Sequence, residues 1–181
     1  MKTIKILVMA AVLTSTSIPL EAAVPSGASA RLAYSTLAKL AGSWRSTSTK
    51  GWTEEASYVI GGKGSVVMEI SRFVDTPKDS MMTAFYLDGE RLLLTHFCEA
   101  KNQPRLHATE ISEDGRRIRF TFLDATNLKS PGAGHMHDAE FHLIDDDHMT
   151  SRWSWFQDGT EKWMEEITSE RVKSLTAAGK R

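Results

Sequence analysis

The sequence has little of what marks several large classes of protein. A single cysteine, Cys98, leaves no partner for an internal disulfide, so the fold must depend on its packed core. Lys and Arg number 22 against 23 Asp and Glu, so the chain lacks the basic excess that is typical of nucleic-acid binders. Hydrophobic residues make up 41% and charged residues 25%, which is near the average for globular chains. We therefore expect one ordinary globular domain that does not bind nucleic acid.

Long hydrophobic runs are also missing, because no apolar run approaches the roughly 20 residues that a membrane-spanning helix needs. Two lysines precede the short apolar run 6–13, and small residues follow it, which is the order of a secretory signal peptide. We expect residues 1–23 to be that signal, cleaved between Ala22 and Ala30, with an N-terminal strand or a membrane anchor as the alternative. The mature protein would then be periplasmic or secreted, with no transmembrane segment.

Turn sequences divide most of the remaining chain into short segments that are rich in β-branched and aromatic residues. Three turns are Asp-Gly pairs that begin at Asp88, Asp114 and Asp158, and such pairs suit tight hairpins because Gly accepts a positive φ. Consecutive strands are therefore expected to be antiparallel neighbours. The predicted strands are 43–49, 53–60, 65–74, 80–87, 90–98, 104–111, 116–124, 136–144, 148–157 and 160–171.

About ten strands joined in sequence order predict an all-β fold, an antiparallel up-and-down β-barrel whose closure removes the exposed edges. Residues 24–37 are expected to form a linker and a short helix, with helical apolar residues reaching Leu40. The barrel is expected over 38–172 and a flexible C-terminal tail over 173–181. Because eight strands can already enclose one small ligand, a barrel of this size has room for one.

A Gly-x-Trp sequence, Gly42 to Trp44, opens the first predicted strand, and Arg171 ends the last. An arginine of the last strand that stacks on a tryptophan of the first resembles the signature of the calycin barrels, which include the lipocalins and the fatty-acid-binding proteins. A guanidinium on an indole face is a favourable contact. The resemblance implies that Trp44 and Arg171 close one end of the barrel and do not contact ligand.

Two further stretches, 86–98 running into 102–105 and the Gly-His-Met-His of 134–137, resemble a group of uncharacterised bacterial lipocalin-like proteins. The resemblance covers most of residues 38–172. It implies a ten-stranded barrel and no known activity.

Nitrobindin-type barrels, which are related, bind haem through a His near the C-terminus and carry repeated glycines after the first tryptophan. Here no Gly follows Trp44 until Gly51, and no His follows His148. Haem ligation of that type is therefore not expected.

A metal site is an alternative at His135 and His137, which are two residues apart and share one strand face. Two imidazoles at this spacing ligate a transition metal when a third ligand, such as His96, Glu54 or Glu55, arrives from another strand. Otherwise the imidazoles hydrogen-bond to polar neighbours at the mouth of the barrel.

His96 and Cys98 also share a strand face, which raises the alternative of a Cys–His nucleophile. Neighbouring positions on one face lie about 6.6 Å apart, which is too far for the hydrogen bond that such a pair needs. We expect a buried structural thiol instead.

Aromatic and acidic residues fall on common strand faces. Trp153 and Trp155 share one face, and Trp163 is expected to share one with Glu165. An aromatic-lined cavity with a few polar groups is typical of a small-molecule pocket, although ordinary core packing is the alternative. One carboxylate of each pair, 54–55 and 165–166, is expected to face inward, with Arg119 or Arg152 as its partner.

These observations predict an exported barrel that binds a small, partly apolar molecule with a polar or anionic group. Arg105 would hold the anionic group, because its planar fork matches a carboxylate. The expected ligand-binding residues are His96, Asn102, Gln103, Arg105, His135, Met136, His137 and Trp153. No catalytic residue is assigned. The alternatives are an enzyme with His/Glu acid–base or metal-assisted chemistry, and an envelope protein with a filled barrel.

Overall fold

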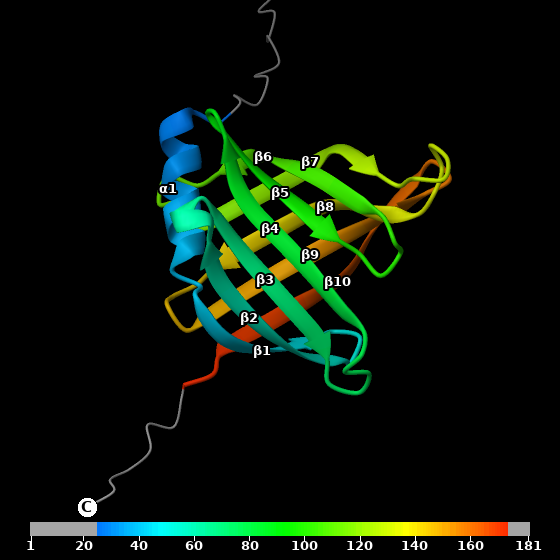
Figure 1. The fold of residues 1–181 in the computed structure, drawn as a ribbon, viewed down its shortest axis with the longest axis horizontal. Helices are drawn as coiled ribbons and strands as arrows, with labels where there is room; N and C mark the ends of the chain where they lie inside the picture. Colours follow the sequence, from blue (N-terminus) through cyan, green and yellow to red (C-terminus); the bar gives the residue numbers. More distant parts are fainter. Residues whose placement is uncertain (1–24, 174–181) are drawn as a thin grey trace, which may run out of the picture.

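The computed structural model describes residues 25–173 and shows a closed barrel of ten antiparallel strands (Figure 1). The predicted all-β up-and-down barrel with a short preceding helix is confirmed. The first strand, β1, pairs with the last, β10, and thereby closes the barrel. The strands are β1 (Gly42–Ser48), β2 (Thr53–Gly61), β3 (Val66–Phe73), β4 (Ser80–Asp88), β5 (Arg91–Phe97), β6 (Gln103–Ile111), β7 (Arg117–Thr126), β8 (His135–Leu143), β9 (His148–Gln157) and β10 (Thr160–Arg171).

Two sequence predictions lie outside the described residues, namely the signal peptide over 1–23 and residues 174–181 of the tail. Within the range 25–173, no helix has the length and apolarity needed to cross a membrane.

The single α-helix of the described chain, α1 (Gly27–Ala38), covers one end of the barrel (Figure 1). It begins at Ser26, whose side chain accepts a hydrogen bond from the Ser29 backbone N–H, as an N-cap residue does. Its buried residues Ala30, Ala33 and Leu37 recur at helical spacing and face the barrel. The helix therefore seals this end with one apolar face.

Gly115, in the turn between β6 and β7, shows how closely α1 approaches the strands. Its φ is +68°, and a Cβ there would lie 2.9 Å from the Leu32 side chain and 3.2 Å from the Ala33 backbone N. Only glycine satisfies both the backbone conformation and the contact.

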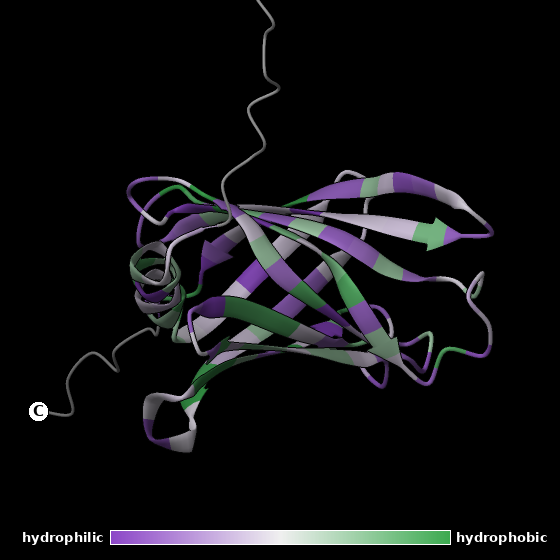
Figure 2. Cartoon of the chain, turned by 90° about the horizontal axis from the view of Figure 1, so that it is seen from above, coloured by the Kyte–Doolittle hydropathy of each residue, from purple (hydrophilic) through white to green (hydrophobic). Residues whose placement is uncertain are grey.

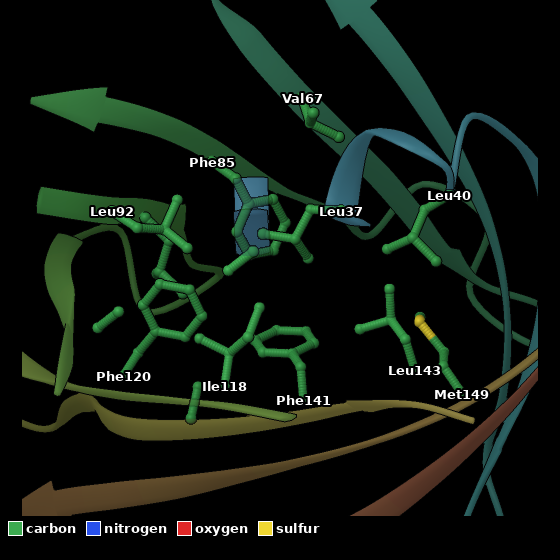
Figure 3. Close-up of a cluster of buried hydrophobic side chains, with 14 of the residues drawn as sticks. Leu37, Leu40, Val67, Phe85, Leu92, Ile118, Phe120, Phe141, Leu143 and Met149 are labelled. Atoms are coloured by element: carbon green, nitrogen blue, oxygen red, sulfur yellow. The ribbon is translucent and has the colours of Figure 1, made fainter. Parts of the chain in front are cut away.

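Hydrophobic and hydrophilic residues alternate along the strands (Figure 2), and in β1 buried and exposed positions alternate with a period of two. In the half of the interior next to α1, apolar side chains from the helix and the strands pack against one another (Figure 3). The members of this cluster include Leu37, Leu40, Val67, Phe85, Leu92, Ile118, Phe120, Phe141, Leu143 and Met149. This half of the barrel is filled.

The α1 end is also closed by the pair that the sequence singled out. The guanidinium of Arg171 lies 4.5 Å above the Trp44 ring. It donates hydrogen bonds of 2.8 Å to the carbonyl oxygens of Lys39, Ala41 and Asp146. The Trp44 indole N–H donates to the Leu40 carbonyl at 2.7 Å. These contacts join β10 to the segment between α1 and β1 and to the loop between β8 and β9, and the stacking on Trp44 joins it to β1.

Candidate functional site

The half of the interior remote from α1 contains a cavity of about 290 Å³. This volume is at the lower end of the range of about 300–1,000 Å³ that ligand pockets occupy. The apolar lining is aromatic and thioether: Trp52, Phe73, Met81, Met136, Phe141, Trp153, Trp155 and Met164. The polar lining is Glu54, Glu69, Ser71, Thr83, His96, Cys98, Glu99, Ser151 and Glu165. The two ends of the barrel therefore differ, since one is filled with apolar side chains and the other contains a chamber with polar and aromatic walls.

Glu69 on β3 and Glu165 on β10 are held in the cavity wall by hydrogen bonds from neighbouring strands. The Tyr58 hydroxyl donates to Glu69 Oε1 at 2.8 Å. The Ser48 hydroxyl and the Trp52 indole N–H both donate to Glu165 Oε2, at 2.5 and 2.7 Å. Each carboxylate is thereby fixed in orientation by donors of its own chain.

Glu54 on β2 is the most unusual carboxyl of the cavity, because the residue is only 7% exposed and no ion pair found within residues 25–173 includes it. Burial raises the pKa of Glu54 to about 8, and the negative charges of Glu69 and Glu165 add to the effect. The hydroxyls of Ser71 and Ser46 oppose the rise. Glu54 therefore holds a proton at neutral pH.

His96 on β5 is buried against the Trp153 ring, with 4.9 Å between the ring centroids. Its Nδ1 lies 3.0 Å from the Thr83 hydroxyl, whereas its Nε2 is buried without a hydrogen-bond partner among the described residues. Burial lowers the pKa of His96 to about 4, so the imidazole is neutral. A neutral ring with one free nitrogen in a cavity wall is a group that a ligand can engage.

Three of the eight predicted ligand-binding residues line this cavity, namely His96, Met136 and Trp153. Trp155 joins Trp153 in the lining, as the common strand face predicts. Cys98 also lines the cavity, and burial raises the pKa of its thiol. A raised pKa disfavours the reactive thiolate.

The predicted polar residues Asn102, Gln103 and Arg105 do not line the cavity. The Asn102 amide is buried and donates to the Gly134 carbonyl at 2.9 Å, which joins two loops at the open end. Gln103 accepts a hydrogen bond of 2.7 Å from the Thr126 hydroxyl. Arg105 alternates outward along β6, and its Nε donates to Asp124 at 2.7 Å. The fork of Arg105 is therefore occupied by a carboxylate of the chain itself.

His135 and His137 form a separate cluster where the pairing of β7 with β8 stops after Phe120. Their rings are 3.2 Å apart between Nε2 and Nδ1, and both lie against Phe122 and Phe156. Among residues 25–173, no three His, Cys, Asp or Glu side chains are grouped in a way that could hold a metal ion.

β-bulges account for the largest error of the strand-face predictions. The register between β9 and β10 shifts between Trp163 and Glu165, so these two residues face opposite sides and the predicted common face is wrong. Trp163 faces outward, where the guanidinium of Arg152 lies 4.7 Å from its ring centre. The shift also turns both Met164 and Glu165 towards the cavity.

A second hollow, of about 590 Å³, runs along the outer faces of β6 to β10. Two of its arginines are paired with carboxylates, because Arg119 contacts Asp138 and Glu140, and Arg152 also contacts Glu140. The two arginines therefore do not partner the carboxylates of the interior, as the sequence had suggested. Because these guanidinium groups are already paired and no buried unpartnered polar atom of residues 25–173 lines this outer groove, it is a weaker candidate site than the interior cavity.

The sequence patterns did not predict several of the cavity residues, above all Glu69, Thr83 and Trp52. A signal for Glu69 exists in β3, where Glu69 and Ser71 take inward positions while Ile70 faces out and is 39% exposed. Such a reversal of the usual pattern, with polar residues inside, marks a strand that lines a polar chamber.

The fold and the cavity together define a closed ten-stranded β-barrel with an acidic and aromatic chamber at one end. No protein-family model matches the sequence, and no curated protein matches it. Among solved structures, the chain is similar to a protein of unknown function of the DUF3598 family from Nostoc punctiforme, with 14% sequence identity and a TM-score of 0.40. The match covers 75% of this chain and 49% of that one, so this chain spans about half the length of that protein.

Proposed function

We propose that this chain is an exported calycin-type barrel that binds a small, partly apolar molecule in its interior cavity. The observation that carries the proposal is the chamber of about 290 Å³, in which aromatic walls surround polar groups and one imidazole nitrogen has no partner among the described residues. Convergent polar groups in an apolar concavity are what small-molecule sites share. The anionic ligand group predicted for Arg105 is not carried forward, because that side chain faces outward and is paired with Asp124.

Native mass spectrometry of the full chain, produced with its N-terminal segment in an exporting host, tests the proposal directly. We expect the native mass to exceed the denatured mass by that of an organic molecule. The denatured mass also reports whether residues 1–23 have been removed, which tests export independently. A chain that retains no added mass, and that binds none of the probes described below, would contradict the proposed function.

A pair of tryptophan variants places any binding in the cavity. Trp155→Ala removes an aromatic wall, whereas Trp163→Ala removes an outward-facing ring of the same size. We expect Trp155→Ala to weaken binding of the neutral probe 3-phenylpropanol about tenfold, since one aromatic contact contributes roughly 0.5–1.5 kcal/mol beyond its buried area. Calorimetric titration should show no change for Trp163→Ala. Equal losses in both variants would locate binding elsewhere.

An acid–base enzyme is a second candidate, favoured by one observation. The cavity combines a carboxyl that keeps its proton at neutral pH, Glu54, with a neutral imidazole whose second nitrogen is free, His96. Groups with opposed pKa shifts in one pocket are typical of general acids and bases. The test is turnover of a panel of small carbonyl compounds. Activity that survives both Glu54→Gln and His96→Phe would exclude this pair as the catalytic groups.

A further inference from the structure

We propose that the cavity selects an organic cation, a protonated amine or related ammonium group on a small apolar body. This inference rests on the proposed function, since it names the ligand class of the same site. It is argued from the charge of the lining, from the direction of its hydrogen bonds and from its aromatic walls.

The lining carries four carboxyl groups without any positive partner from the chain. Glu54, Glu69 and Glu165 face the interior and Glu99 lies at the rim, while none of the lining residues, all within 25–173, is Lys or Arg. None of the ion pairs found in this range includes any of these four residues. Burying carboxylates without a cation is costly, so the site is electrostatically incomplete as it stands.

Hydrogen bonds within the chain hold Glu69 and His96 in the cavity wall. Burial and the Glu69 charge raise the pKa of Tyr58, so its hydroxyl keeps its proton and donates to Glu69. The Thr83 hydroxyl lies 3.0 Å from His96 Nδ1 and occupies that nitrogen, as donor or acceptor according to the tautomer of the ring. Only Nε2 of His96 is therefore left for a ligand among the described contacts.

His96 Nε2 is one of three buried side-chain polar atoms without a hydrogen-bond partner among the described residues, and it is the one of the three that lines the cavity. Both donors to Glu165 engage its Oε2, and no hydrogen bond to Oε1 is found within the described range. Glu165 Oε1 and, in the tautomer with its proton on Nδ1, His96 Nε2 are acceptors that a donor on the ligand can engage. A protonated amine supplies up to three N–H donors together with the missing charge.

The apolar walls fit the same class of ligand. Trp52, Trp153 and Trp155 line the chamber, and an indole face attracts a cation more strongly than other aromatic side chains do. The carboxylates and the negative ring faces would repel an anion, and a neutral molecule would not neutralise the charge of Glu165.

Binding of a cation is coupled to the proton that Glu54 holds. The groups that face Glu54 are Glu69 on β3, Glu165 on β10, Tyr58 on β2 itself and His96 on β5, none of which is positively charged. A cation in their midst lowers the pKa of Glu54, so its proton leaves as the ligand enters. The apparent affinity for a permanent cation should therefore rise with pH up to about 8 and then level off.

Three probes of matched size separate charge from shape: 3-phenylpropylammonium, 3-phenylpropanol and 3-phenylpropionate. Titration calorimetry of the full chain at pH 7 should show the cation binding at least tenfold more tightly than the alcohol, with the propionate weakest. Repeating the cation titration in two buffers of different ionisation enthalpy should show proton release.

Two carboxyl pairs on neighbouring positions provide matched variants. Glu54→Gln and Glu165→Gln change inward groups, while Glu55→Gln and Glu166→Gln change their outward, exposed neighbours. We expect Glu165→Gln to weaken cation binding at least tenfold, Glu54→Gln to abolish the proton release, and both outward variants to match the wild type. Thermal unfolding of each variant verifies that it folds.

The outcomes distinguish this inference from the proposed function. If the three probes bind alike and the inward variants change nothing, the cavity binds small molecules but does not select cations, and the inference is overturned. If 3-phenylpropylammonium fails to bind at millimolar concentration, the inference is overturned as well. The proposed function is contradicted only if, in addition, the native protein retains no added mass and neither of the other two probes binds.

Discussion

At the scale of one residue, Glu54 shows that burying a carboxyl group in the cavity lowers the free energy of unfolding. Burial, with the nearby carboxylates, raises its pKa from 4.5 to about 8, so between these values the folded state holds a proton that the unfolded state has lost. The free energy of unfolding therefore falls as pH rises through this window. Burial lowers the pKa of His96 from 6.5 to about 4, which makes the free energy of unfolding rise with pH between those values. The two effects oppose each other from about 4.5 to 6.5, and above 6.5 only the fall remains.

The wild type is therefore expected to lose stability between pH 6.5 and 8, by up to about 2 kcal/mol for one proton. Glu54→Gln should remove much of this loss. A weaker dependence of stability on pH should remain in the variant, because burial also raises the pKa of Glu69. Urea unfolding at the two pH values measures the difference, with Glu55→Gln as the control that behaves like the wild type. Parallel losses in the wild type and in Glu54→Gln would mean that Glu54 is already ionised in the folded protein.

At the scale of the elements, the sequence predicts the strands far better than the faces they present. Turn residues mark the boundaries, and at Asp158 and Gly159 both φ angles are positive, at 50° and 78°, as a two-residue hairpin requires. Alternation then assigns faces correctly for as long as the register is regular. It fails at bulges, and the shift between Trp163 and Glu165 reverses a face with no residue type that announces it.

Part of the predicted site lies away from the cavity for a related reason. Asn102, Gln103 and Arg105 are polar residues near the mouth, but whether a polar group serves a ligand or a neighbouring strand depends on contacts between segments far apart in sequence. Asp124 on β7 pairs with Arg105, and the carbonyl of Gly134 before β8 accepts a hydrogen bond from the Asn102 amide. These pairings follow from the register of the folded barrel.

The junction of β1 and β10 depends on one side chain more than on any other. Arg171→Ala would leave three backbone carbonyls without their donor and would expose the Trp44 ring, so we expect a loss of about 2–4 kcal/mol in the free energy of unfolding. Arg171→Lys should restore little of it, because an ammonium cannot reproduce the planar fork.

Urea unfolding of these variants should be compared with Arg45→Ala, which breaks an exposed pair with Glu55 and should change stability by less than about 1 kcal/mol. A loss for Arg171→Ala no greater than that of Arg45→Ala would show that the strand ladder closes the barrel without help from the guanidinium.

At the scale of the whole molecule, stability and binding are assigned to opposite ends of one barrel. The half next to α1 is packed with apolar side chains, whereas the remote half holds the chamber. Mutations in the first half should therefore change stability and leave ligand affinity unaltered.

Leu37→Ala tests this separation. Leu37 is a fully buried residue of α1, and its truncation should lower the free energy of unfolding by about 2–5 kcal/mol. Leu32→Ala, on the same helix at a position that is 41% exposed, is the control and should cost little. Neither variant should alter the affinity for 3-phenylpropylammonium. A change in affinity for Leu37→Ala under conditions in which it remains folded would reveal that the two ends are coupled.

The pairing of β1 with β10 also determines when the molecule can mature during synthesis. Trp44 lies opposite Arg171 in the ladder, so the first strand must wait for the last. Almost the whole barrel sequence has to be synthesised before β10 can pair with β1 and Arg171 can stack on Trp44. Contacts so distant in sequence are slow to form, and until then the nascent polypeptide keeps two open sheet edges. Closure of the barrel therefore becomes possible only at the end of synthesis, because it needs β10, the last strand of the described chain.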